Sequence, residues 1–301
     1  MNAKKTKKIV VLATGGTIAG LASDASKPQN YTAGQVGVAD LLHGFAHDGV
    51  ELLTEQVAQI DSKDMSFDVW QSLLARVAYW VKQDDVQGVV ITHGTDTLEE
   101  TAYFLQVVLQ PTKPVALTCA MLPANAPDCD GPGNLIDALA LVQLPDASGV
   151  SVVCAGHVHA GQAVQKSHSH QRNPFISQVG VTHPNALRVP SVAQVLACAH
   201  WPRVELVFNH AAADGRLVRA LMSHDAPQGW VVAGTGNGTL HHDLEAALLD
   251  AQKQGAQVLR ASRCAQGGVQ SREADVLPHA GSLTPVQARV ALWMHLVAQQ
   301  I

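Results

Sequence analysis

The amino-acid sequence predicts an α/β fold with two domains. The large N-terminal domain is expected to hold a mostly parallel sheet flanked by helices, and the smaller C-terminal domain is expected to be α/β as well. Short apolar runs alternate with longer amphipathic segments, which is typical of parallel strands joined by helices. The chain has 301 residues and is 47% hydrophobic, which suffices for about two domains with sizeable cores. A proline-rich stretch interrupts the alternation and predicts the connection between the domains.

The N-terminal domain is expected to span residues 1–183. Five short apolar runs in it predict strands, at residues 9–13, 51–60, 86–92, 114–119 and 150–155. After Ser66, a favoured helix N-cap, apolar residues recur at three- and four-residue spacing as far as residue 81 and predict a helix. Two further helices are expected at 98–109 and at 134–142, the second after a turn rich in glycine and proline.

Residues 184–201 are expected to link the domains, and residues 202–301 to form the C-terminal one. Apolar runs in this part predict strands at 204–209, 229–233 and 256–260, and amphipathic segments predict helices near 215–222, 240–254 and 285–299. The last helix has Thr284 at its predicted N-cap and Pro285 at its first position, which are the residue types best suited to those places.

Composition and charge narrow the classes of function. The net charge is -5, and basic residues form no extended run after the first residues, so neither a nucleic-acid partner nor a membrane partner is expected. Only 15% of the residues are charged, against roughly 25% in an average domain, which favours a homo-oligomer. The five cysteines include no CxxC pair and favour a reducing, cytoplasmic location. A secretory signal is the alternative interpretation of the lysine-rich start and the apolar run 9–13, but a buried strand explains that run more simply.

Two strand-end loops carry the candidate chemistry, because ligands of open parallel sheets bind beyond the carboxyl ends of the strands. Gly15 and Gly16 follow the first strand and present Thr17 there. The loop lacks the GxGxxG spacing of a nucleotide site. Taken alone, it would be interpreted as a glycine turn in which the threonine has no function. The strand at 86–92 leads to Thr95 and Asp96. Asp96 alone would read as an N-cap, but two hydroxyls with a carboxylate fit an acyl-transfer site.

Long motifs in the sequence resemble those of the bacterial L-asparaginase family. ATGGTIAG at 13–20 and ITHGTDTLEETAYFL at 91–105 resemble its two signature motifs, the second in the form of the type II branch. The resemblance covers essentially the whole chain, through NYTAGQVGV at 30–38, DSKDM at 61–65, DGPGNL at 130–135, GTGNG at 234–238 and SLTPVQARV at 282–290. It implies an amidohydrolase that converts L-asparagine to L-aspartate and ammonia without a cofactor or metal.

The resemblance also implies catalytic roles at five positions. Thr17 matches the nucleophile that forms a covalent acyl-threonine intermediate. Tyr31 matches a lid tyrosine that helps to take the proton from Thr17 and closes over the substrate. Thr95, Asp96 and Lys166 match a second triad, in which the lysine makes its hydroxyl partner easier to deprotonate.

Substrate-binding residues follow from the same resemblance. Ser62 matches the hydroxyl that holds the α-carboxylate of the substrate, Asp96 the acceptor of its ammonium group, and the backbones of Gly16 and Ala120 further contacts. Lys63 stands where better-known members carry glutamine or glutamate. A cation there is expected either to strengthen the binding of the carboxylate or to narrow the site against the longer glutamine.

Two residues of the C-terminal part are implied to act in a neighbouring subunit. Asn237 and Glu273 match residues that complete the active site of a partner. Outside the family context each would be read as a solvated loop residue. The expected assembly is therefore a homotetramer, a dimer of intimate dimers with shared active sites.

Three other functions are kept as alternatives. A mixed glutaminase-asparaginase is possible because discrimination by one methylene is worth only about 1–3 kcal/mol. A metal-dependent hydrolase is suggested by His157, His159, His168 and His170, since alternate residues of a strand share a face, although no carboxylate or cysteine partner stands at a recognisable spacing. A non-catalytic amino-acid sensor would be expected to lose a nucleophile, and both threonines are present.

Overall fold

The computed structural model describes residues 7–45 and 49–300, and the chain divides into two compact units between Ser177 and Gln178. The apolar run 9–13 lies in a strand of the first unit, as predicted, whereas the lysines at 4 and 5 lie outside the described residues. The expected link at 184–201 falls within the second unit and contains a short helix. Its bounds, and those of the two domains, stay a prediction. No helix in the described ranges has the length and apolar character needed to cross a bilayer.

A six-stranded sheet forms the centre of the first unit, in the order β4-β1-β5-β6-β7-β8. The first five strands of that order are parallel and β8 is antiparallel to β7, which confirms the mostly parallel sheet. The strands are β1 (Lys7–Gly15), β4 (Val50–Ile60), β5 (Val86–Thr92), β6 (Val115–Thr118), β7 (Val150–Cys154) and β8 (His157–Ala160). Five of the six coincide with the predicted apolar runs, and β8 was not predicted.

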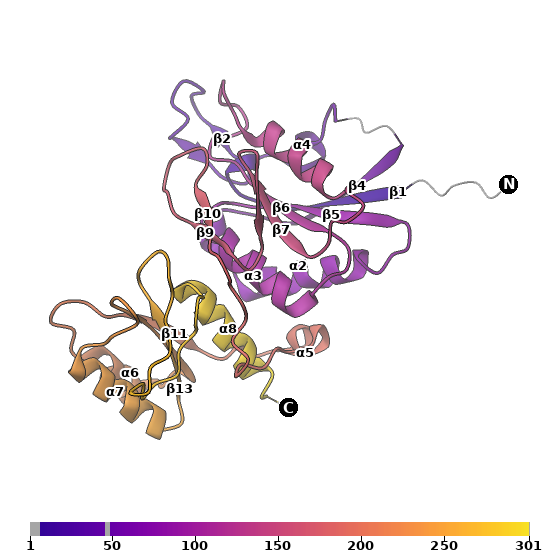
Figure 1. The fold of residues 1–301 in the computed structure, drawn as a ribbon. Helices are drawn as coiled ribbons and strands as arrows, with labels where there is room; N and C mark the ends of the chain where they lie inside the picture. Colours follow the sequence, from indigo (N-terminus) through magenta and orange to yellow (C-terminus); the bar gives the residue numbers. More distant parts are fainter. Residues whose placement is uncertain (1–6, 46–48, 301) are drawn as a thin grey trace. The chain divides into compact units, whose positions relative to one another are not determined.

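Helices flank this sheet on both faces (Figure 1). They are α1 (Val38–Leu41), α2 (Phe67–Trp80), α3 (Leu98–Leu109) and α4 (Gly131–Leu141). The Ser66 side chain accepts a hydrogen bond from the Val69 amide, which confirms it as the N-cap of α2. Helix α4 begins at Gly131 rather than at 134. The predicted turn is in fact the first helical turn, because a proline there lacks only an N–H that would have no partner within the helix.

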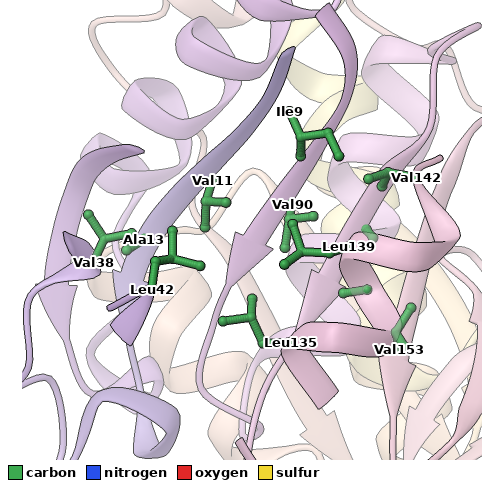
Figure 2. Packing of buried hydrophobic residues seen from close by; sticks show 12 residues of the cluster. Ile9, Val11, Ala13, Val38, Leu42, Val90, Leu135, Leu139, Val142 and Val153 are labelled. Atoms are coloured by element: carbon green, nitrogen blue, oxygen red, sulfur yellow. The ribbon is translucent and has the colours of Figure 1, made fainter. Parts of the chain in front are cut away.

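The hydrophobic core on one face of the sheet is built by strand alternation. Ile9, Val11 and Ala13 of β1 point to the same side and pack with α1 and α4 (Figure 2). All three are nearly inaccessible to solvent. Burial of β1 on both faces explains its unbroken apolar sequence, because a strand in the middle of a covered parallel sheet has no solvent-facing side.

Two small hairpins and two single 3-10 turns were not predicted. The hairpins pair β2 (Leu21–Ala22) with β3 (Tyr31–Thr32) and β9 (Val164–Lys166) with β10 (Phe175–Ser177). The turns, η1 (Thr17–Ala19) and η2 (Ser62–Asp64), follow β1 and β4. Segments of two or three residues are too short to display any hydrophobic period, so the sequence pattern cannot reveal them. They nevertheless carry much of the candidate site.

The second unit holds a three-stranded parallel sheet in the order β11-β12-β13. Its elements are α5 (Val192–Ala197), β11 (Val204–Phe208), α6 (Arg216–His224), β12 (Gly229–Gly234), α7 (His242–Lys253), β13 (Gln257–Ser262) and α8 (Pro285–Val297). Trp230 and Val232 of β12 pack with α6 and α7 in a second core. Thr284 caps α8 in a reciprocal pair with Gln287, as its sequence position predicts. The fold is thus α/β in both units.

Candidate active site

Three loops meet beyond the carboxyl ends of β1, β4 and β5, and glycine lets them touch. Gly16 has φ +82° and lies so close to the next loop that a Cβ on it would stand 2.4 Å from the Gly94 Cα. A Cβ on Gly94 would in turn stand 2.5 Å from Ser62 Oγ. Both approaches are closer than any side chain allows. The direct apposition of these backbones brings the loops that carry Thr17, Ser62 and Thr95 together.

Thr17 lies in η1 and is hydrogen-bonded to a tyrosine. Its side chain is nearly buried, and its Oγ1 lies 2.7 Å from the hydroxyl of Tyr31. Tyr31 belongs to the two-residue strand β3, and its side chain is 37% exposed. The threonine is therefore enclosed by protein while its partner faces solvent. We call these two residues the Thr17 pair.

The hairpin that carries Tyr31 is anchored to the turn at 16–20 and to the loop after β6. The Tyr31 ring packs on Gly20, where a Cβ would stand 2.8 Å from the ring. Asn125 bonds both the amide and the carbonyl of Ala22 at 2.8 Å, and the Ala124 amide donates to the Gly20 carbonyl. The position of Tyr31 over Thr17 thus depends on the loop that follows β6.

The second threonine has a charged partner. Lys166, at the end of β9, donates from Nζ to Thr95 Oγ1 at 2.8 Å and to Asp96 Oδ1 at 2.5 Å. The lysine side chain is only 16% exposed, whereas that of Asp96 is 54% exposed. We call these three residues the Thr95 cluster. An ammonium group that is shielded from water interacts strongly with both oxygens.

Ser62 connects these loops through both its side chain and its backbone. The hydroxyl oxygen accepts from the Asp96 amide at 3.2 Å, and the Ser62 carbonyl accepts from Thr97 Oγ1 at 2.8 Å. The side chain is buried. Because the oxygen acts as an acceptor toward Asp96, the hydroxyl proton of Ser62 remains available for an anion.

A buried histidine supports the loop after β5. His93 Nδ1 lies 2.7 Å from the Gly94 carbonyl, and its Nε2 lies 3.0 Å from Thr101 Oγ1, which also accepts from Trp70 Nε1. The threonine proton therefore goes to Nε2, and Nδ1–H donates to Gly94. Burial lowers the pKa of His93 to about 4, so the ring stays neutral and keeps this arrangement near neutral pH.

Glu99, in the first turn of α3, is a further ionisable group of this region. Burial raises the pKa of its carboxyl to about 8, with a smaller contribution from Glu100, although the backbone N–H of Lys166 donates to it and opposes the rise. Its Oε2 is enclosed and has no hydrogen-bond partner. Sequence reasoning singled out neither Glu99 nor His93, and the only signal for them was their place inside the 91–105 motif.

The remaining predicted binding residues of the first unit differ in their surroundings. Gly16 donates its N–H to the Ile60 carbonyl and accepts from Gly34, and Ala120 is fully buried beside Ile18 and Ala19. Both therefore have roles in loop packing.

Lys63 is paired within its own turn. Its Nζ lies 2.7 Å from an oxygen of Asp61 and 3.4 Å from one of Asp64, with 62% of the side chain exposed. The hydrogen bond that Lys63 donates to Asp61 raises the pKa of Lys63. Two neighbouring carboxylates thus already engage the unusual cation.

Asn237 and Glu273 lie in the second unit, on two loops that bond to each other. Asn237 Nδ2 donates to the Gln270 carbonyl at 2.8 Å, and the Gln270 amide donates to Asn237 Oδ1 at 2.7 Å. Glu273 is exposed three residues further along the same loop.

The histidines behind the metal alternative are engaged in local hydrogen bonds. His157 Nδ1 bonds the Ala155 carbonyl, His159 Nδ1 bonds Ser177, and His168 Nδ1 accepts from the amides of His170 and Gln171. Across residues 7–45 and 49–300, none of the four belongs to a group of three ligands within reach of one ion. The group with that spacing is His241, His242 and Asp243 at the start of α7.

The fold and this site define a class of protein: an α/β protein with two strand-end threonine hydroxyls, each hydrogen-bonded to a polar side chain. Such hydroxyls are suited to attack on a carbonyl carbon. Residues 8–190 match the family model "Asparaginase, N-terminal", and residues 203–300 match "Glutaminase/Asparaginase C-terminal domain". The chain belongs to the asparaginase family.

Individual relatives agree with this assignment. The chain is 36% identical to L-asparaginase 2 of Escherichia coli (strain K12), over 96% of this chain and 88% of that protein. It is 33% identical to the glutaminase-asparaginase of Pseudomonas fluorescens biotype A, over 98% and 88%. The crystal structure of a probable cytoplasmic L-asparaginase from Campylobacter jejuni superposes with a TM-score of 0.86 at 30% identity, covering 97% of this chain and 98% of that one.

Proposed function

We propose that the protein is an L-asparagine amidohydrolase that releases ammonia and L-aspartate through a covalent acyl-threonine intermediate. One observation carries the proposal. Two enclosed threonine hydroxyls lie at the ends of neighbouring strands, each beside a polar partner. Thr17 Oγ1 lies 2.7 Å from the Tyr31 hydroxyl, and Thr95 Oγ1 lies 2.8 Å from the Lys166 ammonium nitrogen. Relatives named L-asparaginase over nearly the whole chain support the substrate.

In the first half-reaction, Thr17 Oγ1 attacks the side-chain amide carbon of asparagine. The Tyr31 hydroxyl, at 2.7 Å, relays the threonine proton toward the leaving nitrogen. The carbon–nitrogen bond then breaks, ammonia leaves, and a β-aspartyl ester remains on Thr17. A hydroxyl nucleophile needs such a neighbour because it is weak in its neutral form.

In the second half-reaction, water attacks the ester carbonyl and the bond to Thr17 Oγ1 breaks. The threonine regains a proton and L-aspartate leaves. The Thr95 cluster assists here: a hydroxyl held by Lys166 is a polarised hydrogen-bond partner for the attacking water. Asp96 shares the same ammonium group and so keeps the lysine in place.

The substrate is held by its amino-acid end. The Ser62 hydroxyl donates to the α-carboxylate, since its oxygen already accepts from the Asp96 amide. The half-exposed Asp96 carboxylate accepts the substrate ammonium group. The backbones of Gly16 and Ala120 complete the contacts. Lys63 lies next to Ser62 at the carboxylate end, with its ammonium group paired to Asp61 and Asp64.

The proposed assembly is a homotetramer in which each active site is completed by Asn237 and Glu273 of a neighbouring subunit. The low charged fraction of 15% supports it, as do exposed apolar side chains such as Phe208 and Leu217, which are 52% and 58% exposed. Light scattering after gel filtration tests the assembly, and a mass of one subunit would exclude it.

The proposed location is the cytoplasm. The five cysteines carry free thiols, three of them buried, which fits a reducing compartment. The Campylobacter jejuni neighbour is itself called cytoplasmic. Fractionation of the native host, with an antibody against the protein, tests this, and recovery in the periplasmic fraction would contradict it.

The decisive experiment is ammonia release by the purified, EDTA-treated protein with L-asparagine and L-glutamine supplied separately at matched concentrations. Release from asparagine alone supports a selective asparaginase. Release from both supports the glutaminase-asparaginase alternative, which the Pseudomonas fluorescens relative favours. No release from either would overturn the proposal. Activity in untreated but not in EDTA-treated protein would revive the metal-dependent hydrolase.

A further inference from the structure

The second unit contains a buried arginine that sequence reasoning did not select. Arg260 lies on β13 and is 5% exposed. Its Nε donates to the Leu277 carbonyl at 3.1 Å, its Nη1 to the Gly238 carbonyl at 3.2 Å, and its Nη2 lies 2.8 Å from Asp275 Oδ1. One guanidinium group thus joins a strand to two separate loops, which its planar fork of donors suits well.

Two of the three contacts of the Arg260 guanidinium, those of Nη1 and Nη2, lead to residues next to Asn237 and Glu273. The Nη1 branch holds the carbonyl of Gly238, which follows Asn237. The Nη2 branch holds Asp275, whose other oxygen accepts the amide of Arg272, the residue before Glu273, at 3.0 Å. The Arg272 amide and then Arg260 hold the pKa of Asp275 below its usual value, so the carboxylate stays charged and the branch stays intact near neutral pH.

Further contacts make the two loops a single assembly. The Asn237 side chain bonds the backbone of Gln270 twice. A Cβ on Gly238 would stand 2.8 Å from the Val269 side chain, and the Val269 amide donates to the Gly281 carbonyl at 2.8 Å. These contacts join the loops at one side, while Arg260 anchors both to the sheet.

We propose that Arg260 is a positioning residue, whose buried guanidinium holds the loops at 235–239 and 263–281 in register so that they are presented together to the active site of a neighbouring subunit. The inference rests on the proposed function and extends it to a residue that touches no substrate. Without the guanidinium, two carbonyls and a carboxylate lose their common partner. Each loop then loses its side-chain anchor to β13, while the backbone hydrogen bonds of residue 260 to residues 278 and 280 remain. A displacement of about 1 Å is enough to lower a rate by about 10²-fold.

The first test is complementation between subunits. Thr17→Ala retains intact loops but lacks the proposed nucleophile, and Arg260→Met retains the nucleophile but lacks the loop anchor. In a mixture that is dissociated and reassembled at equal concentrations, half of the symmetric dimers are mixed, and each has one complete site. We expect each parent to be deficient and the mixture to recover about a quarter of wild-type asparaginase activity.

The outcomes separate this inference from the proposed function. Full activity of Thr17→Ala would contradict the proposed function itself. If Thr17→Ala is inactive and Arg260→Met is fully active, only the role of Arg260 is overturned. Deficient parents that never complement each other would overturn the claim that the loops serve a neighbour.

The second test compares graded variants with a matched control. Arg260→Lys keeps the charge near Asp275 but lacks the fork that reaches both carbonyls, and Asp275→Asn weakens only the branch toward Glu273. We expect kcat/KM to fall about 10²-fold in Arg260→Met and less in the other two. Arg216→Met is the control, since the Arg216 side chain is 86% exposed and pairs with Asp214 at the start of α6, outside both loops, and it should remain within about twofold of wild type.

A double variant with Asn237→Ala shows whether Arg260 positions the loops or only stabilises the fold. If Arg260 acts through the loops, Arg260→Met should cost little further activity in an Asn237→Ala background, because both changes damage one unit. Fully multiplicative losses, or a fall in melting temperature with unchanged kinetics of the folded enzyme, would assign Arg260 a structural role alone.

Discussion

The Thr17 pair and the Thr95 cluster share a position at the end of a parallel strand, but their threonines have different hydrogen-bond partners. Thr17 follows β1 and Thr95 follows the neighbouring parallel strand β5, and both are nearly buried. Thr17 meets the hydroxyl of Tyr31, which lies on a two-residue strand. Thr95 meets an ammonium group that is 16% exposed and is shared with a carboxylate.

This difference shows that the Thr17 pair depends on the conformation of a hairpin, whereas the Thr95 cluster depends on the charge of Lys166. Removing the hairpin from Thr17 would leave its hydroxyl without its partner, whereas the lysine of the Thr95 cluster is fixed by two hydrogen bonds and by the contact of its backbone with Glu99. The Thr17 pair is therefore broken by a movement of the hairpin, and the Thr95 cluster by the loss of a charge.

The largest effect should come from the two threonines. Thr17→Ala is expected to lower kcat/KM by more than about 10⁴-fold, because the variant lacks the hydroxyl that we propose forms the ester. Thr95→Ala should be comparably harmful. The double variant should be hardly worse than either single one, since residues that act as one unit show non-additive losses. Ammonia release measures this, and clearly multiplicative losses would show that the two threonines act independently.

Lys166→Met should come next, with a loss of about 10³-fold in kcat, since general acid–base assistance is worth roughly 10²–10⁴-fold. The charge that Thr95 and Asp96 share would disappear. Steady-state kinetics with asparagine measures the loss. Activity within tenfold of wild type would mean that the hydroxyl of Thr95 needs no cation.

Tyr31→Phe should lower kcat by about 10²-fold, at the lower end of the same range, because its ring still packs on Gly20 while its hydroxyl is lost. A matched control is Tyr79→Phe, on the exposed side of α2 and 48% exposed, which should leave kcat unchanged. Full activity of Tyr31→Phe would show that the Tyr31 hydroxyl takes no part in proton transfer and that the ring only covers Thr17.

The last expected effect is on stability rather than on rate, and it concerns Glu99 and pH. The folded-state pKa of about 8 lies above the ordinary value of 4.5. Between these values the folded chain holds a proton that the unfolded chain has released, so this group's contribution to stability is full below about pH 4.5 and is lost as the pH rises toward 8.

Glu99→Gln cannot ionise and should therefore gain roughly 2–4 kcal/mol in free energy of unfolding over wild type between pH 5 and pH 8. Denaturant unfolding at the two pH values measures the gain. Glu100→Gln, the next residue in the same helical turn, is the control and should show no comparable change. An equal response of both variants would contradict the assignment to Glu99.

Sequence reasoning predicted the main strands and helices because each is long enough to show a period. Helix α3 was predicted at its observed bounds, 98–109, and the five main strands of the large sheet coincide with apolar runs. The misses are β2, β3, β8, β9, β10, α1 and α5, all of six residues or fewer. The early start of α4 was missed because a glycine and proline pair reads as a turn unless the helix N-terminus is already located.

The sequence by itself determined the parallel sheet, the glycine-bearing loop with Thr17 and the motif with Thr95 and Asp96, since each is encoded in adjacent residues. The family resemblance already grouped Lys166 with Thr95, and the tertiary structure supplied their contact across 71 positions. Only the tertiary structure decided that burial raises the pKa of Glu99 and that Arg260 joins two loops. The physical reason is that periodicity and turn chemistry are local. Distances between distant side chains and the exclusion of water arise only when the elements pack.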